Sequence, residues 1–128
     1  EVILSQPGVR ELFNAGRNAS LKIAGLGTAD ASAQLVTTGL IEPREIAEIH
    51  ATGGVGEMLG YFFDANGKVL ETSLTARTLA VDLDGPEESR IVAIAGGLSK
   101  IAAIRAVLKS GRLKGLITDE LTAMALVK

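Results

Sequence analysis

Apolar residues recur along this chain in two patterns, one typical of helices and the other of buried strands. Residues 7–18 open with Pro-Gly and place apolar side chains at positions 9, 12 and 13, which predicts a helix. The almost wholly apolar runs 21–26 and 91–95 predict strands buried on both faces, and 116–118 predicts another. Further helices are expected to begin at Pro43, to run from just after residue 95 to a left-handed cap at Gly111, and to span 120–128.

The period changes to two from residue 57 onward, which predicts a hairpin. Residues 57–63 alternate, so positions 59, 61 and 63 are expected to share one face of a strand. The turn-forming residues 64–67 then lead to a return strand at 68–74, and 78–83 is a further strand candidate. In the last helix the inward side chains are expected to be Leu121, Met124 and Ala125.

The composition favours an α/β fold with a mainly parallel sheet flanked by helices. The chain has 128 residues, of which 47% are hydrophobic but only 3% aromatic, so Ala, Leu, Ile and Val must fill the core. Such aliphatic cores are usual where helices cover a parallel sheet. This composition disfavours an all-β sandwich. The expected fold is therefore a helix-flanked, mainly parallel sheet with a β-hairpin.

Charge and the scarcity of special residues exclude several functions. The 13 basic and 15 acidic residues give a net charge of −2, and the basic residues are scattered along the sequence. This stretch is therefore not expected to bind DNA. Cysteine is absent and His50 is the single histidine, which disfavours a disulfide framework or a metal site, and no cofactor is expected. No apolar run reaches the length of about 18 residues that a membrane span requires. A metal-free cytoplasmic protein is the simplest interpretation.

The loop after the 91–95 strand carries the clearest chemical signal. In an open parallel sheet, ligands bind beyond the carboxyl ends of the strands. Gly96 and Gly97 allow close approach of a ligand, Ser99 is expected to cap the following helix, and the free N–H groups of its first turn can receive an anion. Lys100 opposes the helix dipole in that turn unless an anion is bound. We therefore predict a small-anion site in this loop.

A plainer interpretation is that the glycines only make a tight turn and that Lys100 points into solvent. The coincidence of all these features at the favoured end of the sheet argues for the site. Neither common nucleotide motif is present, because Gly25-Leu26-Gly27 would need a glycine where Asp30 stands, and no GxxxxGK[ST] string occurs. A dinucleotide or P-loop site is therefore disfavoured.

Two further glycine-containing segments are candidates for the same site. Residues 53–57 expose backbone, and Glu57 can accept hydrogen bonds from sugar hydroxyls, although a plain connection with a solvated Glu57 explains the pattern equally well. Gly27 and Thr28 follow the first strand and can add an N–H and a hydroxyl, although Thr28 can merely cap its loop. The pair at 118–119 is more typical of a helix N-cap than of a ligand group.

Several sequence blocks together resemble the effector-binding domain of SorC-type bacterial transcription regulators. The resemblance spans nearly the whole chain, and its most specific parts are the glycine-to-Phe-Phe-Asp block and the Ala-Gly-Gly-x-x-Lys loop. The blocks are Pro7–Phe13, Gly25–Thr28, Gly53–Asp64, Val92–Lys100 and Leu116–Glu120.

The resemblance implies a fold similar to that of the sugar-phosphate isomerase and glucosamine-phosphate deaminase group, used here as a sensor. It implies a regulator of sugar catabolism, with a helix-turn-helix outside this chain for DNA and this domain for a sugar or phosphosugar effector. Gly97 and Lys100 would hold a phosphate, and Glu57 would bond sugar hydroxyls. Residues 1–128 would be the C-terminal portion of a single effector domain whose first half precedes Glu1.

Two other functions remain open from the sequence. An enzyme of the same fold, isomerising or deaminating a sugar phosphate, would need a general base and an acid, and Glu57 is a candidate base without an evident partner. Alternatively, the hairpin at 57–74 packs on a neighbouring subunit through positions 59, 61 and 63, which is compatible with sensing. The leading hypothesis is an allosteric effector domain in a homo-oligomeric regulator, either a dimer or a tetramer.

Overall fold

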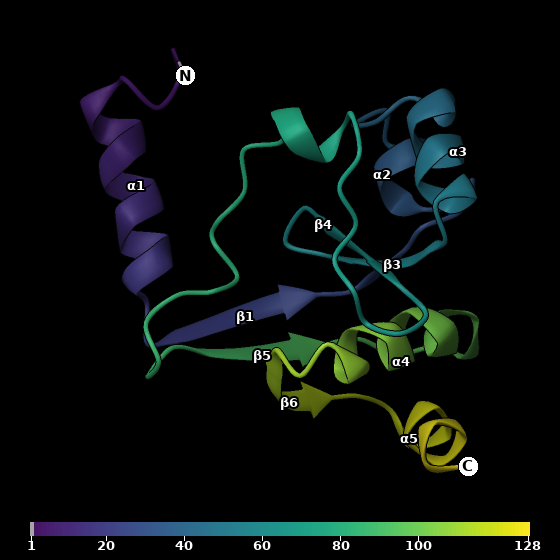
Figure 1. Ribbon diagram of the computed structural model, residues 1–128. Coiled ribbons are helices and arrows are strands. Elements are labelled where there is room, and N and C mark those ends of the chain that lie inside the picture. Colours follow the sequence, from purple (N-terminus) through teal and green to yellow (C-terminus); the bar gives the residue numbers. More distant parts are fainter. Residues whose placement is uncertain (1) are drawn as a thin grey trace.

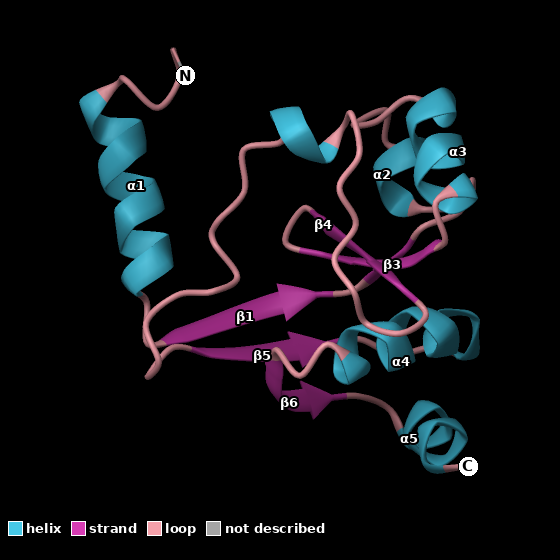
Figure 2. Ribbon diagram, viewed as in Figure 1, coloured by secondary structure: helices cyan, strands magenta, loops and turns pink. Residues whose placement is uncertain are grey.

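The computed structural model describes residues 2–128 and is built on two three-stranded sheets (Figures 1 and 2). The first sheet is parallel, with the strand order β1-β5-β6. The second is antiparallel, with the order β2-β3-β4. The predicted α/β class with a mainly parallel sheet and a hairpin is confirmed. The strands are β1 (Leu21–Gly25), β2 (Gly27–Thr28), β3 (Gly54–Met58), β4 (Tyr61–Asp64), β5 (Arg90–Ile94) and β6 (Leu113–Ile117).

The helices begin and end largely where the sequence predicts. Glu42 and Glu45 form a capping box at the start of α3, in which the Glu42 N–H donates to Glu45 Oε2 at 2.8 Å. Gly111 follows α4 with a φ of 72°, as predicted for a left-handed cap. The elements are α1 (Pro7–Asn18), α2 (Gln34–Thr37), α3 (Pro43–Ala51), α4 (Ile101–Lys109), α5 (Glu120–Val127) and the 3₁₀ turns η1 (Thr75–Arg77) and η2 (Leu98–Lys100).

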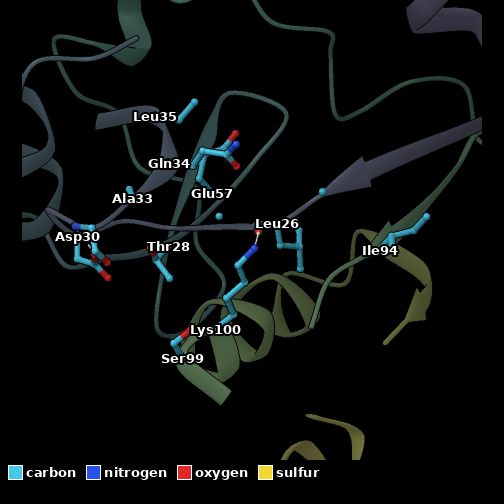
Figure 3. A pocket seen from close by; sticks show the side chains of 13 residues that line it. Leu26, Thr28, Asp30, Ala33, Gln34, Leu35, Glu57, Ile94, Ser99 and Lys100 are labelled. Atoms are coloured by element: carbon cyan, nitrogen blue, oxygen red, sulfur yellow. Dashed lines mark hydrogen bonds between the residues drawn. The ribbon is translucent and has the colours of Figure 1, made fainter. Parts of the chain in front are cut away.

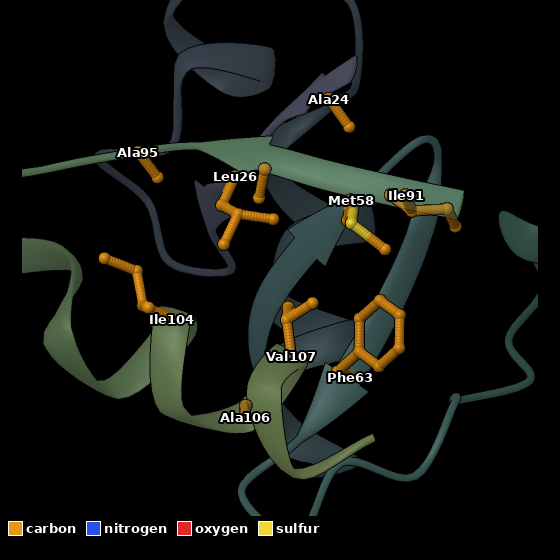
Figure 4. Close-up of a cluster of buried hydrophobic side chains, with 10 residues drawn as sticks. Ala24, Leu26, Met58, Phe63, Ile91, Ala95, Ile104, Ala106 and Val107 are labelled. Carbon is orange, nitrogen blue, oxygen red and sulfur yellow. The ribbon is translucent and has the colours of Figure 1, made fainter. Parts of the chain in front are cut away.

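The main core lies between the parallel sheet, α4 and the β3–β4 hairpin (Figure 4). Its side chains are mostly small or aliphatic, such as Ile104 and Val107 of α4, with Phe63 as a large aromatic member. Helix α4 lies so close to β3 that a Cβ on Gly56 would stand 3.0 Å from the Cα and carbonyl oxygen of Ala103. A second cluster packs α3 against Phe62 on the other face of the hairpin.

The hairpin turn lies at Leu59 and Gly60, so the prediction of one continuous strand over 57–63 is wrong. Both residues have positive φ values, 55° and 86°, the geometry of a two-residue turn whose twist matches that of antiparallel strands. Beyond β4 the expected turn at 64–67 is present, but 68–74 forms only a single bridge, Phe63 with Val69, in place of the predicted return strand.

The early turn changes which side chains share a face. Met58 pairs with Tyr61, and the next pairs along the ladder bring Phe63 opposite Gly56. Phe63 is fully buried and Tyr61 packs partly buried against the same core. The face predicted for a neighbouring subunit is therefore interior surface of this fold.

Two more local predictions are wrong. Residues 78–83 form no strand. Val81 instead meets α1, where a Cβ on Gly16 would lie 3.2 Å from it, and Leu83 packs against the main core. In α5, Leu121 and Met124 are exposed while Thr122 is fully buried. The helix is turned this way because Thr122 bonds the loop that follows β5.

Gly67 gives a test of how the 64–67 turn docks on α4. Gly67 and Gly111 both have positive φ, but only at Gly67 would a Cβ collide with backbone, 2.4 Å from Ser110 N. We expect Gly111→Ala to cost about 1 kcal/mol of unfolding free energy and Gly67→Ala about 2–4 kcal/mol. Urea denaturation of the two variants measures the difference, and equal losses would show that the turn can move off the helix.

Candidate functional site

A polar cleft of about 480 Å³ opens at the carboxyl ends of β1 and β5, where the chain passes through Leu26 from the parallel sheet into β2 (Figure 3). Both sheets line it, together with the loop that leads to α2. This is the end of a parallel sheet where ligands are expected. The lining residues are Gly25, Leu26, Gly27, Thr28, Asp30, Ser32, Ala33, Gln34, Leu35, Glu57, Ile94, Ser99 and Lys100.

Lys100 reaches into this cleft from η2. Its ammonium group donates to the Leu26 carbonyl oxygen at 3.0 Å, so the side chain lies across the passage between the sheets (Figure 3). Lys100 is partly buried, which contradicts the plainer expectation that it points into solvent. An ammonium group has three donors, so two remain for a ligand or for water.

Glu57 lies on β3 directly opposite Gly27. Its Oε1 accepts the N–H of Gly60 at 2.7 Å, which ties the carboxylate to the hairpin turn. Its Oε2 lies over β2, where a Cβ on Gly27 would approach it to 3.1 Å. Burial raises the pKa of the Glu57 carboxyl group, and the bond from Gly60 only partly opposes that shift.

Thr28 and Ser99 also line the cleft, so five of the seven predicted residues come together there: Gly27, Thr28, Glu57, Ser99 and Lys100. Ser99 does not cap α4, because it lies inside η2 and the helix has no side-chain cap.

The sequence interpretation missed the loop 30–35 as part of the site. Asp30 accepts the Ser32 N–H at 2.8 Å and also binds the Ser32 hydroxyl, which is the main reason that the pKa of Asp30 is lowered. Gln34 adds an amide at the start of α2. The missed signal was the run of polar side chains at alternate positions directly after the first strand.

Gly96 and Gly97 do not line this cleft. The N–H of Gly97 donates to Thr122 Oγ1 at 2.8 Å and more weakly to Asp119 Oδ2 at 3.2 Å. A Cβ on Gly96 would stand 2.3 Å from Asp119 Oδ2, so a side chain at position 96 would force this carboxylate of the same chain to move. Asp119 also accepts the Thr122 N–H at 2.9 Å, which confirms it as the N-cap of α5. Bonds from Thr122 lower the pKa of Asp119.

Other site classes find no support in the described part of the chain. Residues 2–128 contain no group of three or more acidic or histidine side chains suited to a metal ion. His50 lies beside Asp30 in a smaller neighbouring hollow of about 230 Å³ and does not line the main cleft. Over the same residues, no helix has the length and apolar character needed to cross a bilayer.

The whole chain matches a known protein family and several curated regulators. Residues 1–128 match the family described as "Putative sugar-binding domain". The chain is 64% identical over 127 residues to the erythritol catabolism regulatory protein EryD of Brucella abortus, covering 99% of this chain and 40% of that protein. It is 34% identical over 131 residues to the transcriptional regulator LsrR of Klebsiella pneumoniae, covering 99% of this chain and 41% of the relative.

The fold recurs in a solved regulator. The full-length sorbitol operon regulator SorC of Klebsiella pneumoniae superposes with a TM-score of 0.86 at 21% identity, covering 99% of this chain and 42% of that one. The chain thus spans about two fifths of the length of the relatives it matches. It belongs to the sugar-binding domain family of SorC-type transcriptional regulators.

Proposed function

We propose that this chain is the effector-sensing part of a DNA-binding transcription regulator and that its ligand binds in the cleft between the two sheets. The main support is that one cleft at the carboxyl ends of β1 and β5 brings together Lys100, Glu57, Thr28 and Ser99. Ligand bound there touches both sheets, so it can shift the balance between two arrangements of the protein and hence its affinity for an operator. DNA is contacted by a helix-turn-helix outside this chain.

The relatives narrow the class of effector. The 64% identical relative is named for erythritol catabolism, so a small polyol, sugar or phosphorylated derivative is the proposed ligand and erythritol the first compound to test. The relatives are regulators, which favours a sensor over an isomerase or deaminase of similar fold. A cytoplasmic location is part of the proposal, because a transcription regulator acts where the DNA is.

The chain is proposed to be the C-terminal portion of a larger effector domain. One face of the parallel sheet carries an uncovered apolar row on which Leu21, Ile23, Ile94 and Ile117 are 51%, 63%, 52% and 57% exposed. Parallel sheets are normally covered on both faces. The extra length of the relatives can supply such a cover.

The uncovered face and the cleft share residues. Gly25, Ile94 and Ile117 are neighbours in register across the sheet, and the first two of them also line the cleft. A segment that covers the face would therefore border the ligand. Assembly of the intact regulator into a homo-oligomer is part of the proposal, because two-fold operators require paired DNA-binding modules.

An effector screen tests the proposal directly. Thermal unfolding of the intact regulator is followed with erythritol, other polyols, free sugars and sugar phosphates. A compound at 100 times its Kd stabilises the folded state by about 2.7 kcal/mol, seen as a rise in Tm of several degrees. If every compound leaves Tm unchanged, the sensing role is rejected, and if the protein converts a sugar phosphate, the enzyme alternative replaces it.

Lys100→Met tests whether the Lys100 ammonium contributes to effector binding. Lys109 is a matched control, because its ammonium also donates to a backbone carbonyl, that of Ala65 at 3.2 Å, away from the cleft. Lys100→Met should cost about 1 kcal/mol of stability and Lys109→Met less, because the Lys109 bond is exposed to solvent, but only Lys100→Met should weaken effector binding, by about tenfold or more. Equal effector affinities in the two variants would remove Lys100 from the site.

Glu57→Gln should weaken binding while stabilising the free protein. Burial raises the folded-state pKa of Glu57 above its ordinary value of 4.5, so at neutral pH its ionised form costs stability that the amide does not. The gain in Tm should shrink as the pH falls through the raised pKa, because both side chains are then neutral.

Effector affinity should drop about tenfold or more in Glu57→Gln, since a charge-assisted hydrogen bond is worth about 1.5–3 kcal/mol. Calorimetric titration and unfolding across pH measure the two effects, with the exposed Glu71→Gln as control. If Glu57→Gln is less stable than the wild type at pH 7 but binds the effector with the same affinity, Glu57 only supports the turn.

A further inference from the structure

We propose that the part of the effector held by this chain is uncharged, so that the cleft binds the hydroxyl groups of a small polyol and not a phosphate. This inference rests on the proposed function and names its ligand class. It departs from the sequence-based expectation that the loop after β5 holds a phosphate.

The predicted phosphate cradle is already filled from within the chain. The Gly97 N–H, which a phosphate on this loop would need, is donated to Thr122 and Asp119. The Asp119 carboxylate lies beside Gly96, so this loop already faces an anionic group of the same chain. Bonds from Thr122 favour the ionised form of Asp119, so this position presents negative charge to an approaching phosphate.

The charges that line the cleft also disfavour an anion. Its titratable side chains are Asp30, Glu57 and Lys100, two acids against one base, and no arginine is among the lining residues. The bonds from Ser32 hold Asp30 ionised. Phosphate sites commonly use bidentate arginine or several converging N–H groups, whereas the lining of this cleft offers a single ammonium with two N–H groups left after its bond to Leu26.

The remaining groups match the chemistry of a polyol. Carboxylate oxygens of Asp30 and Glu57 accept from hydroxyl donors, and the free N–H groups of Lys100 donate to hydroxyl oxygens. The hydroxyls of Thr28, Ser32 and Ser99 and the amide of Gln34 can do either. Apolar contacts for a carbon chain come from Leu26, Ala33, Leu35 and Ile94.

Calorimetric titration of the intact regulator with erythritol and with its monophosphate ester tests the inference. We expect erythritol to bind at least about tenfold more tightly than the ester, a difference of about 1.4 kcal/mol. Its Kd should change less than about twofold between low and high salt, because an uncharged ligand is not subject to ionic screening. Tighter binding of the ester would overturn the inference while leaving the sensing role intact.

Asp30→Asn provides the matched charge test. Removing this acid should weaken the binding of erythritol several-fold and strengthen the binding of the ester. The control Glu88→Gln removes an exposed acid outside the cleft and should change neither affinity. Weaker binding of both ligands in Asp30→Asn would also count against the inference. If no polyol, sugar or phosphate binds the wild-type regulator, the proposed function itself fails.

Discussion

The candidate site depends on the hydrogen bond from Lys100 to the Leu26 carbonyl oxygen, which links the turn after β5 to the connection between β1 and β2. At Leu26 the chain leaves the parallel sheet and enters the antiparallel one, and a carbonyl at such a crossing has no neighbouring strand to pair with. The ammonium supplies the missing donor. Because Lys100 itself follows β5, the same bond ties the carboxyl ends of the neighbouring strands β1 and β5 to one point beside Glu57 and Thr28.

Around that point, groups that look available in the sequence are already engaged. Gly97 is bonded to α5, Glu57 to the turn at Gly60, and Asp30 to Ser32. These internal bonds fix the positions of the polar groups before any ligand arrives, which lowers the entropic cost of binding. The site is therefore preorganised mainly by hydrogen bonds to main-chain N–H and carbonyl groups, and loop sequence alone does not disclose which groups remain free.

Much of the fold could be predicted because its signals are local. The apolar runs at 21–26 and 91–95, the Pro43 helix start and Gly111 each act through nearby backbone geometry. The failures arise from an unusual backbone conformation or from distant partners. The turn at Leu59 requires a positive φ at a residue that is not glycine, which no pattern of alternation indicates. The true face of α5 follows from a bond between Thr122 and Gly97, 25 residues away in sequence. The sequence predicts the cleft at the correct end of the sheet. It does not show that Asp30 lines the cleft or that the Gly97 N–H is already bonded to α5, because both depend on how distant segments pack.

The contact between α5 and the loop after β5 links the last residues of this segment to the candidate cleft. Thr122 and Asp119 fix Gly97, which begins the short turn that carries Ser99 and Lys100. For the proposed effector cleft, this means that a chimeric regulator built by exchanging effector domains should have its junction beyond α5. A junction within that helix would combine the cleft of one parent with the anchoring Thr122 and Asp119 contacts of another, although no residue that lines the cleft would change.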